Sequence, residues 1–93
     1  MKTLGEVIKV TRSRNFLVKL KSLPEKDLKD RKVVSEDLTL VGVVSDIIGP
    51  VHEPYALVKI LVPLDKSFEF IGKRVYLVES KKEAKLIRYP DTE

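Results

Sequence analysis

Short runs of alternating hydrophobic and polar residues extend along most of the chain. Residues 3–10 and 16–21 are both rich in β-branched and other apolar residues at a spacing of two, which is typical of half-buried strands. The polar stretch between them ends at Asn15, a residue that favours turns. The two segments therefore predict a β-hairpin, in which one face of the second strand carries Phe16, Val18 and Leu20 and the other face carries Leu17, Lys19 and Lys21.

Residues 22–32 break this pattern with Pro24 and seven charged side chains. Ser22 and Glu25 have the spacing of a helix capping box, so one short helical turn is an alternative to an exposed loop. The density of charge favours the loop. The chain then returns through the pair 33–34, as a brief strand or as an anchor on the core.

The longest apolar segment, residues 38–49, predicts a strand with a bulge, a bend or a close backbone approach at Gly42. Residues 54–63 predict the next strand, with Pro54 at its start, where a missing N–H does least harm. The following residues are expected to form a loop that contacts the core through Phe68, Phe70 and Ile71. Two further strands around residues 81–83 are expected to pair as a final hairpin.

About six short strands with regularly spaced turns indicate an all-β fold, a small closed antiparallel barrel. Closure removes the sheet edges that a chain of 93 residues could not otherwise protect. We expect residues 1–93 to form a single barrel domain, with 22–32 as a charged loop and 90–93 as a frayed C-terminus.

The two longest apolar strands carry more hydrophobic side chains than one sheet face needs. In the second of them, alternation places Tyr55, Leu57 and Leu61 outside the barrel, opposite the inward residues Ala56, Val58, Ile60 and Val62. The first is apolar at both parities. A contiguous exposed apolar patch marks an interface, and the alternative is that residues 64–73 cover it.

Residues for catalysis and metal binding are scarce. The chain has no Cys and a single histidine, His52, next to Glu53 in an expected turn. A metal site normally needs three or four protein ligands, and catalysis needs groups with matched roles. The sequence therefore predicts a protein that is not an enzyme and that binds neither a metal nor a cofactor.

The formal net charge is +4, from 18 basic and 14 acidic residues, which fits a mixed soluble surface or a weak attraction to polyanions. Basic pairs occur at Arg12/Arg14 and Lys81/Lys82, both at expected turns. Apolar stretches are too short to span a bilayer and the N-terminus has no secretion signal, so we expect an intracellular, cytoplasmic protein with no membrane partner. The scarcity of thermolabile residues indicates heat adaptation.

The segment "LVGVVSDIIGPVHEPYALVKI", residues 40–60, resembles the central motif of the glycine-arginine-rich protein family of H/ACA ribonucleoproteins. The flanking segments "LGEVIKV" and "GKRVYLVE" agree with the same family, so the resemblance extends over roughly residues 3–79. The residues that carry the motif are Gly42, Asp46, Ile47, Ile48, Gly49, Pro50, Val51, Pro54, Tyr55 and Lys59.

The resemblance implies a six-stranded barrel that acts as a non-catalytic subunit of the guide-RNA-directed pseudouridylation complex, in its compact archaeal form. Such a subunit docks on the pseudouridine synthase, touches guide RNA only indirectly, and promotes substrate loading and turnover in rRNA pseudouridylation and ribosome biogenesis. Eukaryotic relatives are nucleolar. A related H/ACA assembly factor and a generic RNA-binding barrel remain alternatives. The partner-binding residues that we expect are Ile47, Ile48, Gly49, Pro50, Val51, Pro54, Tyr55 and Leu57.

Overall fold

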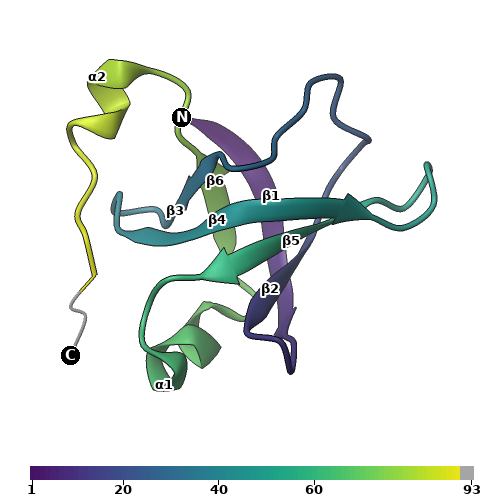
Figure 1. The fold of residues 1–93 in the computed structure, drawn as a ribbon, viewed down its shortest axis with the longest axis horizontal. Coiled ribbons are helices and arrows are strands. Elements are labelled where there is room, and N and C mark those ends of the chain that lie inside the picture. Colours follow the sequence, from purple (N-terminus) through teal and green to yellow (C-terminus); the bar gives the residue numbers. More distant parts are fainter. Residues whose placement is uncertain (91–93) are drawn as a thin grey trace.

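A computed structural model describes residues 1–90 and shows a closed β-barrel, which confirms the predicted fold class (Figure 1). The strands follow one another around the barrel in the order β1-β2-β5-β4-β3-β6, and every neighbouring pair is antiparallel. Their bounds are β1 Lys2–Val10, β2 Asn15–Lys19, β3 Lys32–Val34, β4 Leu40–Ile48, β5 Tyr55–Ile60 and β6 Arg74–Leu77.

The expected hairpin of β1 and β2 is confirmed, with Val10 opposite Phe16 at its closed end. Side chains from all six strands meet inside the barrel and form its core. Phe16 is the largest fully buried side chain, and its ring meets that of Phe70 edge-on at 5.9 Å between centroids. The buried residues of this core are Leu4, Val7, Phe16, Val18, Leu20, Val33, Val41, Val44, Ala56, Val58, Val75 and Leu77.

Strand β1 does not keep the simple alternation of its sequence. Its register shifts once between Thr3 and Gly5, against β6, and again between Val7 and Lys9, against β2. Each shift inserts one unpaired residue and reverses the parity of the side chains that follow. As a result Val7 is fully buried whereas Ile8 is 39% exposed.

Strand β4 contains a register shift with larger consequences. Val44 pairs with Val58, but Asp46 pairs with Leu57, so Ser45 is an extra residue in the strand. Its hydroxyl donates a hydrogen bond to the Leu57 carbonyl at 3.2 Å. Beyond this shift, Ile47 pairs with the buried Ala56 and packs against the core.

The shift accounts for the apolar residues at both parities of β4. Val44 and Ile47, three positions apart, both face inward, and Ile48 is left on the outside, 38% exposed. Nearby, Gly42 makes a close backbone approach, one of the three features expected there from the sequence. A Cβ atom there would lie 2.4 Å from the Lys59 carbonyl oxygen, so no other residue fits without movement.

The segment after β5 is helical rather than a loop: α1 Leu64–Ser67 is followed by the 3-10 helix η1 Phe68–Phe70. Lys66 and Ser67 both donate backbone hydrogen bonds to the Pro63 carbonyl, which starts the helix. Phe70 reaches the core as expected, but Phe68 is 54% exposed, so its predicted contact with the core is wrong. Ile71 is also exposed.

The predicted final hairpin is wrong as well. After β6 the chain forms a short helix, α2 Lys81–Ala84, and only an isolated parallel bridge joins Arg88 to Thr39. Ser80 accepts a hydrogen bond from the Glu83 N–H at 3.1 Å and so caps the helix. Ser80 and Glu83 have capping-box spacing, which is the signal in the sequence that favours a helix here over a strand.

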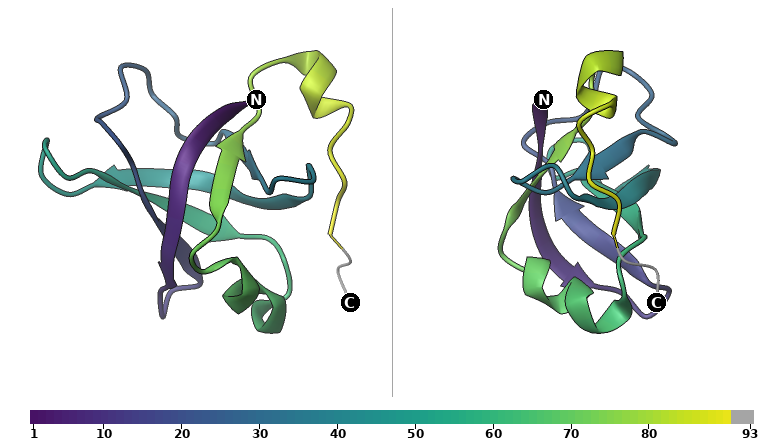
Figure 2. Two further views of the ribbon diagram at one scale, coloured as in Figure 1. Left: turned by 180° about the vertical axis from the view of Figure 1, so that it is seen from behind. Right: turned by 90° about the vertical axis from the view of Figure 1, so that its left-hand side faces the viewer.

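The long connection from residue 20 to 31 contains neither helix nor strand. Leu28 packs it against the core, and backbone hydrogen bonds join Asp30 and Arg31 to Val44. Of the expected frayed segment 90–93, only Pro90 is described, so that prediction lies outside the described residues. The β4–β5 loop projects from one end of the barrel, and α2 lies at the other end (Figures 1 and 2).

The register of β4 can be tested with two neighbouring substitutions. Ile47→Asp would place a carboxylate against the core, and we expect it to reduce the free energy of unfolding by about 2–4 kcal/mol. Ile48→Asp is the matched control, because its side chain points outward, and it should change stability by about 0.5 kcal/mol or less. Chemical denaturation measures both, and equal effects would contradict the register shift.

Candidate docking surface

Pairing across β1, β2, β5 and β4 fixes which side chains share the outer face of the barrel. Directly opposed residues of antiparallel strands lie on the same face with Cβ atoms about 5 Å apart. Three rows result, each crossing the strands. They follow one another from the β1–β2 turn toward the β4–β5 loop. The first joins Asn15, Lys59 and Val43; the second joins Lys9, Leu17, Leu57 and Asp46; the third joins Glu6, Lys19, Tyr55 and Ile48.

Apolar side chains run diagonally through these rows and continue onto the β4–β5 loop. Leu17, Leu57 and Tyr55 are half-buried, Ile48 is 38% exposed, and Val51 at the loop tip is 73% exposed. We call these five residues the outer patch. A contiguous apolar surface of this kind, rimmed by charged groups, is typical of a site of protein association.

Of the eight expected partner-binding residues, the structure brings six to this surface. Ile48, Gly49, Pro50 and Val51 are exposed, and two more, Tyr55 and Leu57, are half-buried beside them. The other two are Ile47, which packs against the core, and Pro54, which is fully buried. These two support the surface from below rather than forming it.

The β4–β5 loop is held in one conformation by local contacts. Gly49 has a φ of 94°, in the left-handed region that favours glycine, and the Glu53 N–H donates a hydrogen bond to the Pro50 carbonyl at 2.9 Å. Pro54 accepts a hydrogen bond from the Leu20 N–H at 3.1 Å, which fastens the loop to the end of β2. These contacts therefore stabilise the turn that exposes the loop tip.

Leu17 belongs to the surface although the motif does not include it. The signal for it is present in the sequence, because Leu17 stands on the polar face of its strand between Lys19 and Asn15. An apolar residue among polar ones on the solvent-facing side of a strand is a candidate for a contact outside the barrel. What the sequence could not provide is the pairing of β2 with β5, which places Leu17 opposite Leu57.

The rim of the outer patch carries three basic and two acidic side chains. Lys9, Lys19 and Lys59 stand in the three rows, against the two carboxylates of Glu6 and Asp46. None of these three lysines makes an ion pair with a residue in the described range 1–90. A partner that covers this patch gains from an apolar centre with acidic groups at its edge.

Groups suited to chemistry are sparse near the outer patch. His52 and Glu53 lie exposed in the β4–β5 loop, and no cluster of three His, Cys, Asp or Glu residues occurs within residues 1–90. No helix in the same range is long and apolar enough to cross a membrane.

A second group of exposed apolar residues lies on α1 and η1. Leu64, Phe68 and Ile71 follow one another at helical spacing, and their side chains are 41%, 54% and 43% exposed. An open depression of about 550 Å³ lies on the inner side of η1 and reaches the β3–β4 turn. It is lined by Ser35, Glu36, Asp37, Thr39, Phe70, Lys73, Arg74 and Tyr76.

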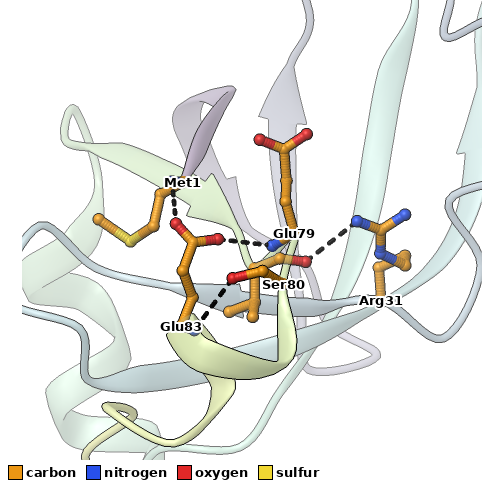
Figure 3. Close-up of polar contacts among 6 residues, drawn as sticks. Met1, Arg31, Glu79, Ser80 and Glu83 are labelled. Carbon is orange, nitrogen blue, oxygen red and sulfur yellow. Dashed lines mark hydrogen bonds and ion pairs between the residues drawn. The ribbon is translucent and has the colours of Figure 1, made fainter.

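A polar network surrounds the start of α2 (Figure 3). The Met1 ammonium pairs with the Glu83 carboxylate, which also accepts a hydrogen bond from the Glu79 N–H at 2.9 Å. Arg31 donates a hydrogen bond to the Val78 carbonyl at 3.0 Å, which ties the long loop to the end of β6. The bond from the Met1 ammonium, with that from Glu79, holds the pKa of the Glu83 carboxyl below its ordinary value.

No protein-family model matches this chain, and no curated protein is similar enough to it to count as a relative.

Bracing of the β4–β5 loop can be tested at Gly49. An added Cβ atom there would sit 2.8 Å from the Glu53 carbonyl oxygen, and the left-handed φ adds about 1–2 kcal/mol of strain. Gly72→Ala is the matched control, because its φ of 86° is also left-handed but nothing lies within 4 Å of the new atom. We expect Gly49→Ala to destabilise the protein by about 1–3 kcal/mol more than Gly72→Ala in denaturant titrations.

The network around Glu83 predicts a pH dependence with a defined sign. Because the folded-state pKa of Glu83 is lowered, its stabilisation is present above the ordinary value of 4.5 and is lost as the pH falls through the folded-state pKa. We expect Glu83→Gln to lower the melting temperature at pH 7 and to make no difference once the carboxyl is protonated. Glu79→Gln is the control, since only its backbone joins the network; a pH-independent effect of Glu83→Gln would contradict this account.

Proposed function

We propose that this protein is a non-catalytic subunit of an H/ACA guide-RNA pseudouridylation complex, which docks on the pseudouridine synthase through the outer patch. The observation that carries the proposal is the braced β4–β5 loop, in which the residues of the family-like motif stand next to one another. Ile48 and Val51 are its exposed apolar residues, and Gly49 and Pro50 shape the turn that presents them.

The geometry suits tight association with a protein. Proline and a left-handed glycine restrict the loop before it binds, so that less conformational entropy is lost on association. Apolar area buried there contributes roughly 25 cal/mol per Å². Tyr55 is suited to anchor the contact, because it combines a large stiff ring with a polar tip and already packs beside Gly49.

In this role the protein supplies no reacting group. It would promote loading and turnover of substrate RNA during rRNA pseudouridylation and ribosome biogenesis by acting on the synthase, and guide RNA would be bound indirectly through the complex. The proposal assigns it neither a cofactor nor a small-molecule substrate, and places it inside the cell in a compact archaeal-type form, the counterpart of nucleolar eukaryotic relatives.

A generic RNA-binding barrel is the second candidate, and the lysines at the rim of the outer patch favour it. That function would require RNA affinity that persists at physiological salt without any protein partner. The related H/ACA assembly factor would use the same outer patch on the same synthase. Its distinguishing feature would be release from the mature particle.

Substituting the loop tip tests the proposed docking directly. Val51→Asp adds a charge to a side chain that is 73% exposed, so the fold should be unaffected while affinity for the synthase falls by about tenfold or more. Leu86→Asp is the matched control, because Leu86 is 59% exposed just beyond α2, at the opposite end of the molecule (Figure 1). Calorimetric titration of each variant against purified synthase measures both affinities.

Loss of binding in Val51→Asp with normal binding in Leu86→Asp is the expected result. Equal affinities for the wild type and Val51→Asp would contradict docking through the loop. No binding of the wild type to the synthase, together with RNA binding at physiological salt, would favour the RNA-binding barrel.

A further inference from the structure

The β1–β2 turn gathers cations that are separated in the sequence. Arg12 and Arg14 stand in the turn itself, Lys9 lies on the strand that enters it, and Lys59 lies opposite Asn15 on the neighbouring strand β5. All four side chains are exposed, and none makes an ion pair with a residue in the range 1–90. The two carboxylates on this outer face, Glu6 and Asp46, belong to the rows further from the turn than Asn15 and Lys59.

The turn is rigid. Arg14 donates its backbone N–H to the Thr11 carbonyl at 3.1 Å, and its own carbonyl accepts a hydrogen bond from Ile60 on β5 at 3.1 Å. The Asn15 backbone N–H donates a hydrogen bond to the Thr11 hydroxyl at 3.1 Å, and its side-chain amide donates one to the Ser13 hydroxyl at 2.9 Å. The Thr11 and Ser13 hydroxyls are hydrogen-bonded to each other at 3.0 Å. The backbone that carries Arg12 and Arg14 is therefore held by hydrogen bonds, and hydroxyl and amide groups lie between their side chains.

Arg14 occupies a backbone conformation that suits glycine better. Its φ is 62°, in the left-handed region where a side chain raises the energy of the backbone. The chain keeps a long cation at a position where the smallest residue would fit with less strain. The side chain is therefore a candidate for a contact outside the protein.

From this arrangement we propose that the β1–β2 turn binds the sugar-phosphate backbone of duplex RNA. Arg, Lys, Ser, Thr and Asn are the side chains that contact phosphates, and the turn itself, residues 11–15, carries no apolar side chain such as a protein partner requires. The turn and Lys59 offer no exposed aromatic ring on which unpaired bases could stack, which favours a duplex over a single strand. The contact is independent of base sequence.

This proposal does not rest on the proposed docking function, and it adds a direct contact with RNA to the indirect one proposed above. The turn lies at the lower edge of the molecule in Figure 1, apart from the projecting β4–β5 loop. A protein on the loop tip therefore leaves Arg12 and Arg14 accessible, whereas Lys9 and Lys59 also stand in the rim of the outer patch. A contact of a few phosphates is weak at physiological salt when it acts alone. Within a ribonucleoprotein, the high local concentration of RNA would make it effective.

The test measures binding of the full-length protein to a fluorescently labelled RNA hairpin by fluorescence anisotropy at several low salt concentrations. The hairpin has about 16 base pairs, the length of duplex that double-stranded RNA-binding domains cover. The variant Arg12→Ser/Arg14→Gly removes two charges and relieves the left-handed strain at position 14, so that it should fold at least as well as the wild type. Lys81→Ala/Lys82→Ala is the matched control, since it removes two charges from α2 at the opposite corner of the molecule.

We expect the turn variant to weaken RNA binding about tenfold or more at low salt and to reduce the slope of log K against log salt by about 1.4–1.8, as for two lost phosphate contacts. The control should retain most of the affinity. Equal losses in both variants, or equally tight binding to polyglutamate, would show a nonspecific attraction or an acidic protein site and would overturn the proposal. Absence of RNA binding by the wild type at low salt would overturn it as well.

Discussion

One extra residue in β4 determines which apolar side chains this protein buries and which it displays. If Ser45 were paired regularly, without the register shift, strict alternation would turn Ile47 outward and Ile48 inward, and the end of the strand would lose its contact with Ala56. With it, Val44 and Ile47 both complete the core, and the outer face gains an apolar residue next to the loop tip. Barrel packing and the exposed surface are consequences of the same shift.

The remaining irregularities serve the closure of a very small barrel. Two register shifts in β1, one between β3 and β4 at Val33 and Val34, and the close approach at Gly42 are the kinds of irregularity by which strands curve into a closed barrel. Closure is narrowest where β3 meets β6, since only two residue pairs join them, and there the chain relies on Val33 and Val34 being fully buried. Most apolar residues of this small chain thus lie in one core, and a few remain exposed and available to contact a partner.

Much of this fold could be predicted from the sequence, because alternation identifies strands and turn residues separate them. The β1–β2 hairpin and the inward residues of β5 follow from spacing alone. The shifts in β1 and β4 could not be predicted, because a bulge depends on which strand pairs with which, and that is a tertiary property. The short helices were missed for a different reason. The segment around Phe68 was expected to be a loop, and no side-chain hydrogen bond caps α1 or η1, whereas the segment around Glu83 was expected to be the turn of a hairpin, and Ser80 caps a helix there instead.

The candidate surface was predictable in its centre and not at its edges. The motif around Gly49 indicated the loop, whereas Leu17 and the basic rim required the order of strands around the barrel. Ile47 and Pro54, expected at the interface, are instead the buried supports of their exposed neighbours. The motif therefore identified the turn from the sequence. The burial of each residue then separates those available to a partner from those that support the turn.

The most direct test of the central claim is amide hydrogen exchange of this protein, free and bound to a purified H/ACA pseudouridine synthase, read by mass spectrometry. If the outer patch is the docking surface, protection on binding should concentrate in the β4–β5 loop and the adjoining ends of β2 and β5. Protection confined to α1 and η1, where Phe68 is exposed, or absence of any protection with the synthase in excess, would contradict it.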